Sequence, residues 1–185
     1  MKQYIYSSQS SLWGEPELLG FGSNEFYIKE IDRKIANDII IKHHYSKKFY
    51  NATYIHLGLF NEENIIGVLQ YGYAMNPASG GSVVLGTKNN EYLELNRMWI
   101  KDDVGKYPES RAVSYSLKYI RKKYPTIKWI QSFADERCGG FGIVYQACSF
   151  DYYGEHKSDF WELDGETFHN SIMTSEKAGP RGYKL

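Results

Sequence analysis

The chain has 185 residues, 42% of them hydrophobic, so we expect a single domain over residues 1–185 with one sizeable core. Its 22 Lys and Arg residues balance 22 Asp and Glu residues, so the overall charge does not single out nucleic acid as a partner. Two cysteines without a CxxC pair exclude a disulfide framework and a cysteine-rich zinc site. This cysteine usage, with no apolar leader and no membrane-length apolar run, favours a cytoplasmic protein.

The N-terminal third is expected to change from irregular chain to regular structure. Residues 1–25, with SSQSS, Pro16 and several glycines, predict an irregular lead-in. Residues 26–31 read as a first strand. Isoleucines at 31, 35 and 39 then recur at helical spacing and predict a helix over about 32–42. That helix ends in a polar, aromatic and basic cluster, HHYSKK at 43–48.

A hairpin and a loop are predicted next. Residues 54–60 and 65–73 are typical of strands, and the polar segment 61–64 predicts the turn between them. The composition of residues 76–82 indicates a loop. Residues 83–85 fit either a short strand or a continuation of that loop.

The segment from 93 to 150 predicts a strand, a helix, a second strand, a glycine-rich turn and a short helix. Leu93 and Leu95 alternate with polar residues, and Arg97 and Trp99 continue the alternation less cleanly. A helix begins near Pro108 and ends before residue 125. The second strand covers residues 127–135, and a helix follows over 143–148.

Two strands joined by a helix of this length form a βαβ unit, so they should be parallel neighbours. Ligands of open α/β sheets bind beyond the carboxyl ends of such strands. Those ends carry Arg97, Trp99 and Asp135. We therefore expect the functional site there.

The C-terminal part predicts short strands at 150–153, 160–163 and 167–172, with Asp164-Gly165 as a tight turn, and a loose tail over 178–185. The fold class predicted from all elements is α/β (α+β). A mixed sheet would combine an antiparallel N-terminal meander with a central parallel strand pair and flanking helices. This order resembles that of the GNAT acyltransferases, which bind acetyl-CoA in the gap between the two parallel strands.

Ordered sequence blocks make the resemblance more specific. They are HYS at 44–46, YIHLG at 54–58, VLQYGYA at 68–74, VLGT at 84–87, LELNRMW at 93–99, ESRA at 109–112, QSFADERCG at 131–139 and VYQA at 144–147. From about residue 42 onward they resemble the Mom family of phage proteins. Several blocks in the same order are more specific than one short motif.

The resemblance implies a transferase with a GNAT-like fold that modifies phage DNA. Such an enzyme converts the N6 amino group of adenine to a carbamoylmethyl (methylcarbamoyl) adduct. The reaction depends on acetyl-CoA and protects the phage DNA from host restriction. The implied partners are double-stranded DNA and acetyl-CoA. A homodimer is one oligomeric state that the sequence leaves open.

Each leading residue also has an ordinary structural interpretation. His44 could act as a base or ligand, or simply interact with the end of a helix. Arg97 could grip an anion or pair with Glu94 or Asp135. Asp135 could accept from the adenine amino group or cap a turn. Tyr145 could be a general acid or part of the core. The resemblance favours the functional interpretations.

The predicted site residues fall into three groups. The catalytic residues are His44, Tyr45, Asp135 and Tyr145. The substrate- or cofactor-binding residues are Arg97, Trp99, Ser110 and Arg111. The DNA-backbone contacts are Lys47, Lys48, Lys118, Arg121 and Lys122, although a basic helix face is often merely solvated. Adenine inside a duplex is out of reach of a deep pocket, so base flipping is expected.

Two features depart from ordinary acyl transfer. The GNAT pyrophosphate loop has a glycine followed by a second glycine or alanine, whereas residues 101–112 offer Gly105 and no second glycine, and Glu109 opposes an anion there. The implied product joins N6 to a methylene, which transfer through the acetyl carbonyl cannot give. A bound iron held by His44, Tyr45 and Asp135 is one hypothesis, although no facial-triad spacing supports it.

Two other classes of protein stay open. The first is an ordinary GNAT N-acetyltransferase that acts on a protein or a small amine. The second is an inactive GNAT scaffold that binds DNA. Finding an acetylated amine while the DNA nucleosides are unchanged would favour the ordinary N-acetyltransferase. A biological effect that survives His44→Ala and Asp135→Ala would favour the inactive scaffold that binds DNA.

Overall fold

The computed structural model describes residues 1–10, 14–135, 141–155, 157 and 159–169. Contacts divide the chain into a large unit, Met1–Asp151, and a small unit, Tyr152–Leu185. The expectation of one domain over the whole chain stays a prediction, and the two units are described separately. Among the described residues, no helix is both long and apolar enough to cross a bilayer.

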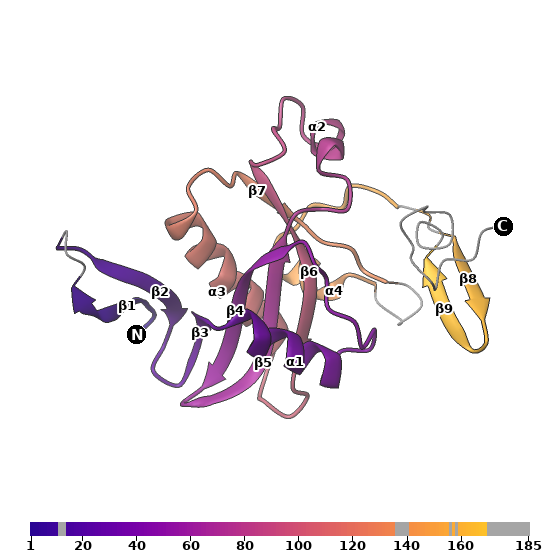
Figure 1. Ribbon diagram of the computed structural model, residues 1–185. Coiled ribbons are helices and arrows are strands. Elements are labelled where there is room, and N and C mark those ends of the chain that lie inside the picture. Colours follow the sequence, from indigo (N-terminus) through magenta and orange to yellow (C-terminus); the bar gives the residue numbers. More distant parts are fainter. Residues whose placement is uncertain (11–13, 136–140, 156, 158, 170–185) are drawn as a thin grey trace. The chain divides into compact units, whose positions relative to one another are not determined.

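The large unit is built on a seven-stranded sheet with the order β1-β2-β3-β4-β5-β6-β7 (Figure 1). Its elements are β1 (Gln3–Ser10), β2 (Pro16–Gly22), β3 (Phe26–Glu30), α1 (Arg33–His43), β4 (Thr53–Asn61), β5 (Asn64–Gly72), η1 (Pro77–Ser79), α2 (Gly80–Val83), β6 (Tyr92–Ile100), α3 (Pro108–Lys123), β7 (Trp129–Gln131) and α4 (Ile143–Ala147). Successive strands pair antiparallel up to β6, and β6 pairs parallel with β7. The predicted mixed α/β sheet is therefore confirmed.

The two long helices cover opposite faces of the sheet (Figure 1). In β5, Leu69 belongs to the core that includes Val113 and Tyr119 of α3. Its neighbour Val68 packs instead with Ile40 of α1. Because successive side chains of a strand point to opposite faces, α3 and α1 lie on different sides. The larger core lies on the α3 side.

A bulge in β6 decides which face each of its later residues occupies. Tyr71 pairs with Leu95 and Gln70 pairs with Arg97, so Asn96 is an extra residue in β6. Leu95 before the bulge and Met98 after it both contact the α3 core. One inserted residue reverses the facing of every residue after it in the strand. Arg97 is therefore directed to the α1 face, which explains why its alternation with Leu95 is imperfect.

The parallel pair is short and then opens. Its register ends at Glu94 paired with Gln131, although β6 continues to Ile100. The prediction of a strand through residue 135 is wrong, because β7 has only three residues. The bulge at Asn96 comes just after the last pair and bends β6 away from a flat ladder. We call this opening, just after Glu94 and Gln131, the splay.

The prediction of an irregular N-terminus is also wrong, because β1 and β2 form there. A Cβ added to Gly20 would lie 2.1 Å from the carbonyl oxygen of Ile28, so glycine permits the close approach of β2 to β3. The Tyr4 and Phe21 rings then pack edge to face with centroids 5.0 Å apart. At this position glycine permits strand pairing, whereas the several glycines of residues 1–25 suggested an irregular segment.

The predicted helices are largely confirmed. The helix expected over 32–42 is α1, and the Asp32 side chain caps it by accepting from Lys34 N at 2.7 Å. The helix expected from Pro108 is α3. The predicted loop at 76–82 instead contains η1 and the short α2. The Val84 N–H closes α2 by donating to the Gly80 carbonyl at 2.9 Å.

The small unit contains the hairpin of β8 (Phe160–Leu163) and β9 (Glu166–His169). Asp164 and Gly165 both have positive φ, as the predicted tight turn requires. The strand expected over 150–153 does not form, and residues 170–185, including the predicted loose tail, lie outside the described part.

Candidate functional site

The C-terminal end of α1 positions His44 beside the splay. The His44 backbone N–H donates to the Ile40 carbonyl at 3.0 Å and so closes the helix. The side chain is 7% exposed. Its Nδ1 lies 2.8 Å from Ser46 Oγ and accepts the Ser46 backbone N–H at 3.1 Å. Burial, with Arg97 and Lys47 nearby, lowers the pKa of His44 to about 4. The imidazole is therefore neutral near pH 7.

Tyr45 joins this helix end to the segment that follows β7. Its hydroxyl donates to Asp135 Oδ2 at 3.4 Å, across 90 positions of sequence. Its ring lies against the His44 ring, with centroids 4.2 Å apart. Tyr45 is 60% exposed and Asp135 is partly buried. The predicted residues His44, Tyr45 and Asp135 are thus brought together.

Arg97 comes to the same place from β6. Its Nε donates to the Lys48 carbonyl at 3.0 Å and its Nη1 to the Asn96 carbonyl at 2.6 Å. Its Cζ lies 5.8 Å from the centroid of the Tyr50 ring. Burial lowers the pKa of Arg97, but a guanidinium stays charged in proteins. Arg97 therefore provides a fixed positive charge next to His44.

A polar clamp that sequence reasoning missed holds the base of the splay. Glu94 accepts from Gln131 Nε2 at 3.0 Å and from Asn96 Nδ2 at 2.9 Å. Asn96 Nδ2 also donates to the Tyr73 carbonyl at 3.4 Å. The bond between Glu94 and Gln131 ties β6 to β7 at their last paired residues. Glu94 and Asn96 lie inside the LELNRMW block, but the alternation there does not reveal that Glu94 meets Gln131.

Tyr145 of α4 lies on the other side of the splay. It packs against the α3-side core and against Phe150, with ring centroids 5.6 Å apart. Burial raises the pKa of the Tyr145 hydroxyl, and the Ser132 side chain nearby opposes the rise. The splay therefore lies between Tyr145 on the α3 side and the cluster of His44 and Arg97 on the α1 side.

Three predicted binding residues lie apart from that cluster. Trp99 stacks on His43, with ring centroids 4.3 Å apart, and packs against the α1-side cluster. Ser110 is in the first turn of α3, where its Oγ donates to the Tyr107 carbonyl at 3.3 Å. Arg111 has its Cζ 3.8 Å from the Phe26 ring centroid. None of these contacts joins them to His44.

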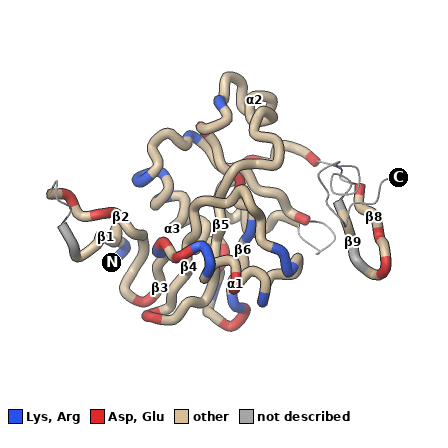
Figure 2. The backbone as a smooth tube through the Cα atoms, viewed as in Figure 1, with Lys and Arg blue, Asp and Glu red and all other residues tan. Residues whose placement is uncertain are grey.

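The basic residues divide between the two faces. Lys47 and Lys48 follow α1, and Lys47 Nζ donates to the Lys42 carbonyl at 2.7 Å. Lys118 of α3 lies over the Phe21 ring, 5.4 Å from its centroid, while Arg121 and Lys122 are exposed on α3. Figure 2 shows Lys and Arg positions both around α1 and at the end of α3. Only the α1 group lies on the face that holds His44.

The predicted metal ligands do not form a recognisable metal site. In the described ranges, no three His, Cys, Asp or Glu side chains lie close enough to hold a metal ion. The Tyr45 hydroxyl is hydrogen bonded to Asp135, and Nδ1 of His44 accepts from Ser46. The hypothesis of an iron held by His44, Tyr45 and Asp135 therefore stays a prediction.

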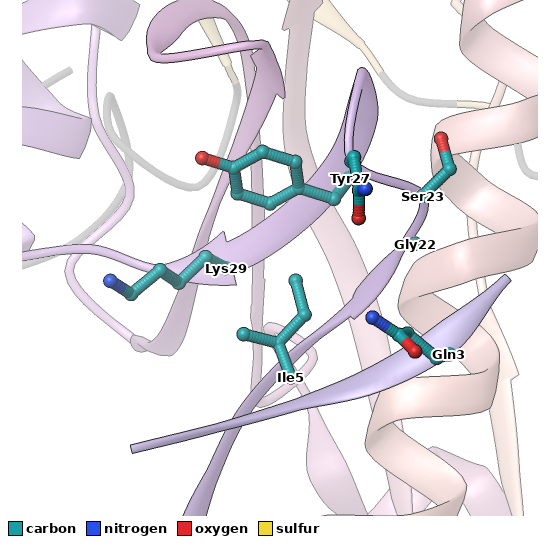
Figure 3. A pocket seen from close by; sticks show the side chains of 7 residues that line it. Gln3, Ile5, Gly22, Ser23, Tyr27 and Lys29 are labelled. Carbon is teal, nitrogen blue, oxygen red and sulfur yellow. The ribbon is translucent and has the colours of Figure 1, made fainter. Parts of the chain in front are cut away.

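A cavity of about 250 Å³ lies elsewhere, at the N-terminal strands. Figure 3 shows Gln3 and Ile5 of β1 facing Tyr27 and Lys29 of β3 across it. The residues that line it are Gln3, Ile5, Gly22, Ser23, Asn24, Tyr27 and Lys29. It includes none of the predicted site residues, so the splay remains the candidate site.

Comparison with known proteins agrees with the family resemblance of the sequence blocks. The model of the Mom protein family matches residues 25–184. The chain is also 51% identical over 172 residues to the protein named methylcarbamoylase mom of Escherichia phage Mu, covering 92% of this chain and 71% of that protein. The family match includes every residue of the cluster at the splay. The chain belongs to the Mom protein family.

Proposed function

We propose that this chain is an enzyme that modifies phage DNA in the host cytoplasm, converting the N6 amino group of adenine to a methylcarbamoyl adduct. The name of the phage Mu relative, with 51% identity, supports the reaction. The observation that carries the proposal is the convergence of His44, Tyr45, Arg97 and Asp135 from three separate segments at the splay.

The residues of the cluster suit an extruded adenine. A carboxylate accepts hydrogen bonds, so Asp135 would accept from the N6 amino group, whose lone pair is delocalised into the ring. Arg97 would stabilise negative charge that develops beside it. The exposed Tyr45 ring offers a surface for base stacking. Lys47 and Lys48 would contact the phosphates next to the flipped nucleotide.

Acetyl-CoA is the proposed cofactor, and the splay is the proposed place for its acyl end. The N-cap residue of α3, Tyr107, makes no side-chain cap bond, so the first N–H groups of α3 suit a phosphate. Ser110 and Arg111 would assist there, although Glu109 opposes an anion in the same turn. Acetyl-CoA would supply the two carbons of the adduct, with CoA leaving as the thiol when an amine donor provides the nitrogen of the terminal amide. Joining the methyl carbon to N6 removes two electrons and two protons, so the reaction also requires an oxidant as a co-reactant. Tyr145 would hold a proton on the α3 side of the gap.

Nucleoside mass spectrometry tests the proposal. The full chain is expressed in bacteria, and the DNA is digested and searched for deoxyadenosine heavier by a carbamoylmethyl group. We expect this species with the wild type and its loss in Arg97→Ala and Asp135→Ala. Asp38→Asn, at the exposed Lys34–Asp38 pair of α1, is the matched control and should leave it unchanged.

Other outcomes of the nucleoside experiment would point to a different function for the chain. N6-acetyladenine alone would mean ordinary acyl transfer on DNA. Unmodified DNA from a folded chain that binds acetyl-CoA would overturn adenine as the substrate and favour an N-acetyltransferase for another amine. Full biological protection by Asp135→Ala, with no modified nucleoside, would favour a scaffold that only binds DNA.

A further inference from the structure

The hydrogen bonds of His44 determine which ring nitrogen carries its proton. The Ser46 backbone N–H is directed at Nδ1, 3.1 Å away. A backbone N–H can only donate, so Nδ1 must present its lone pair. In a neutral imidazole the proton is then on Nε2. The lowered pKa of His44 agrees, because the ring is neutral near pH 7.

The Ser46 hydroxyl is compatible with the same assignment. Its Oγ lies 2.8 Å from Nδ1 and 3.3 Å from the Lys48 carbonyl, so its proton has an acceptor while Nδ1 accepts the Ser46 backbone N–H. The Lys48 N–H approaches Oγ at 3.4 Å and occupies a lone pair of that oxygen. A proton on Nδ1 would instead face the Ser46 N–H directly.

We infer that His44 acts as a hydrogen-bond donor through Nε2–H, and that Ser46 is the positioning residue that fixes this tautomer. The inference rests on the proposed function and deepens it. The hydrogen bonds of the ring within the described part of the chain are all made by Nδ1, and Arg97 and Tyr45 lie next to the ring. The substrate atom that Nε2–H meets must be an acceptor, either a ring nitrogen of adenine or the carbonyl oxygen of the acyl donor.

This tautomer excludes two other roles in the resting enzyme. A general base needs a free lone pair on the nitrogen that faces the substrate, and Nε2 carries a proton instead. A metal ligand at Nε2 normally donates its other N–H to a carbonyl or carboxylate. Here the other nitrogen accepts from Ser46. His44 thus resembles a neutral imidazole that polarises its partner.

NMR on the full ¹⁵N-labelled chain measures the tautomer independently of activity. A long-range ¹H–¹⁵N spectrum near pH 7 should show an unprotonated Nδ1 and a protonated Nε2 for His44. The His44 signals are those lost in the His44→Gln spectrum, and His43→Gln removes the neighbouring histidine as a control. A protonated Nδ1 on His44 would overturn the inference.

Two substitutions of His44 distinguish a hydrogen-bond donor from a general base. Glutamine can place an N–H near the position of Nε2 but cannot accept a proton as a base. We expect His44→Ala to lower the early yield of modified deoxyadenosine by about 10²–10³-fold, the usual cost of one preorganised donor. His44→Gln should recover at least about tenfold of that loss. Equal loss in two folded variants would overturn the donor role.

The acceptor is identified by the thermal shift that acetyl-CoA produces. If acetyl-CoA stabilises the wild type and His44→Gln but not His44→Ala, the acceptor is the donor carbonyl. If it stabilises all three equally while the yields still differ, the acceptor is on the base. A wild type that makes no modified deoxyadenosine would defeat the proposed function, whereas the tautomer would still be decided by NMR.

Discussion

At the scale of single residues, His44 combines burial with fixed neighbours. The positive charges of Arg97 and Lys47 and the lost hydration all disfavour its protonated form. The unfolded chain takes up a proton at about pH 6.5, whereas the folded chain does so only at about pH 4. His44 therefore contributes stability above pH 6.5 that is lost as the pH falls through this window.

The corresponding prediction compares the wild type with His44→Gln between pH 7 and pH 4. The free energy of unfolding of the wild type should fall relative to the variant by on the order of 3 kcal/mol, since the glutamine does not titrate. Urea unfolding at several pH values measures it. A difference that stays constant with pH would contradict a neutral, buried His44. His43→Gln, at an exposed position, is the control substitution of the neighbouring histidine.

At the scale of elements, one polar network fastens α3 to β2 and β3. Lys123 Nζ lies 2.8 Å from Glu30 and 3.1 Å from Glu17. The Tyr124 hydroxyl donates to Glu30 at 2.9 Å. Burial would raise the pKa of Glu30, but hydrogen bonds from Lys123, Tyr119 and Tyr124 outweigh burial and lower it. Glu30 therefore stabilises the folded chain above the pKa of an unfolded Glu, and this contribution is lost in acid.

Glu30→Gln should destabilise the chain by about 1–3 kcal/mol, because it leaves partly buried donors without their carboxylate. Asp38→Asn is the matched change at an exposed i,i+4 pair and should cost less than about 0.5 kcal/mol. Thermal or urea unfolding near neutral pH compares the two. Equal effects would mean that the network contributes no more than a surface ion pair.

At the scale of the whole large unit, the two faces of the sheet carry different groups. The cluster of His44 and Arg97 lies on the α1 face, whereas α3 covers the opposite face with Arg121 and Lys122. Under the proposed function, phosphates near the flipped adenine come closest to the end of α1. The basic composition of α3, which suggested a DNA contact, is partly explained by Lys118 over Phe21 and by Lys123 in the Glu30 network.

Two double charge-reversal variants test whether DNA binds on the α1 face or on the α3 face of the sheet. The double variant Lys47→Glu with Lys48→Glu should weaken binding to duplex DNA and flatten its salt dependence. The double variant Arg121→Glu with Lys122→Glu removes the same charge from α3 and should have a clearly smaller effect. Fluorescence anisotropy at two salt concentrations measures both. The reverse ranking would place the DNA on the α3 face.

Local patterns were enough to predict much of the architecture from the sequence. Isoleucine spacing located α1, and Pro108 with the apolar repeat after it located α3. The βαβ arrangement predicted that β6 and β7 are parallel. The ordered blocks identified the family before any geometry was known. These signals succeed because helical periodicity, turn chemistry and family blocks are properties of neighbouring residues.

The tertiary structure alone decided how the site is assembled. The bulge at Asn96 directs Arg97 to the α1 face, and no repeat in the sequence marks that extra residue. The Tyr45–Asp135 bond spans 90 positions, so its formation depends on the packing of the sheet. The clamp at Glu94 likewise needs β7 to pair in one register. Which face a side chain occupies and which distant group it meets follow from strand register, which only the folded sheet specifies.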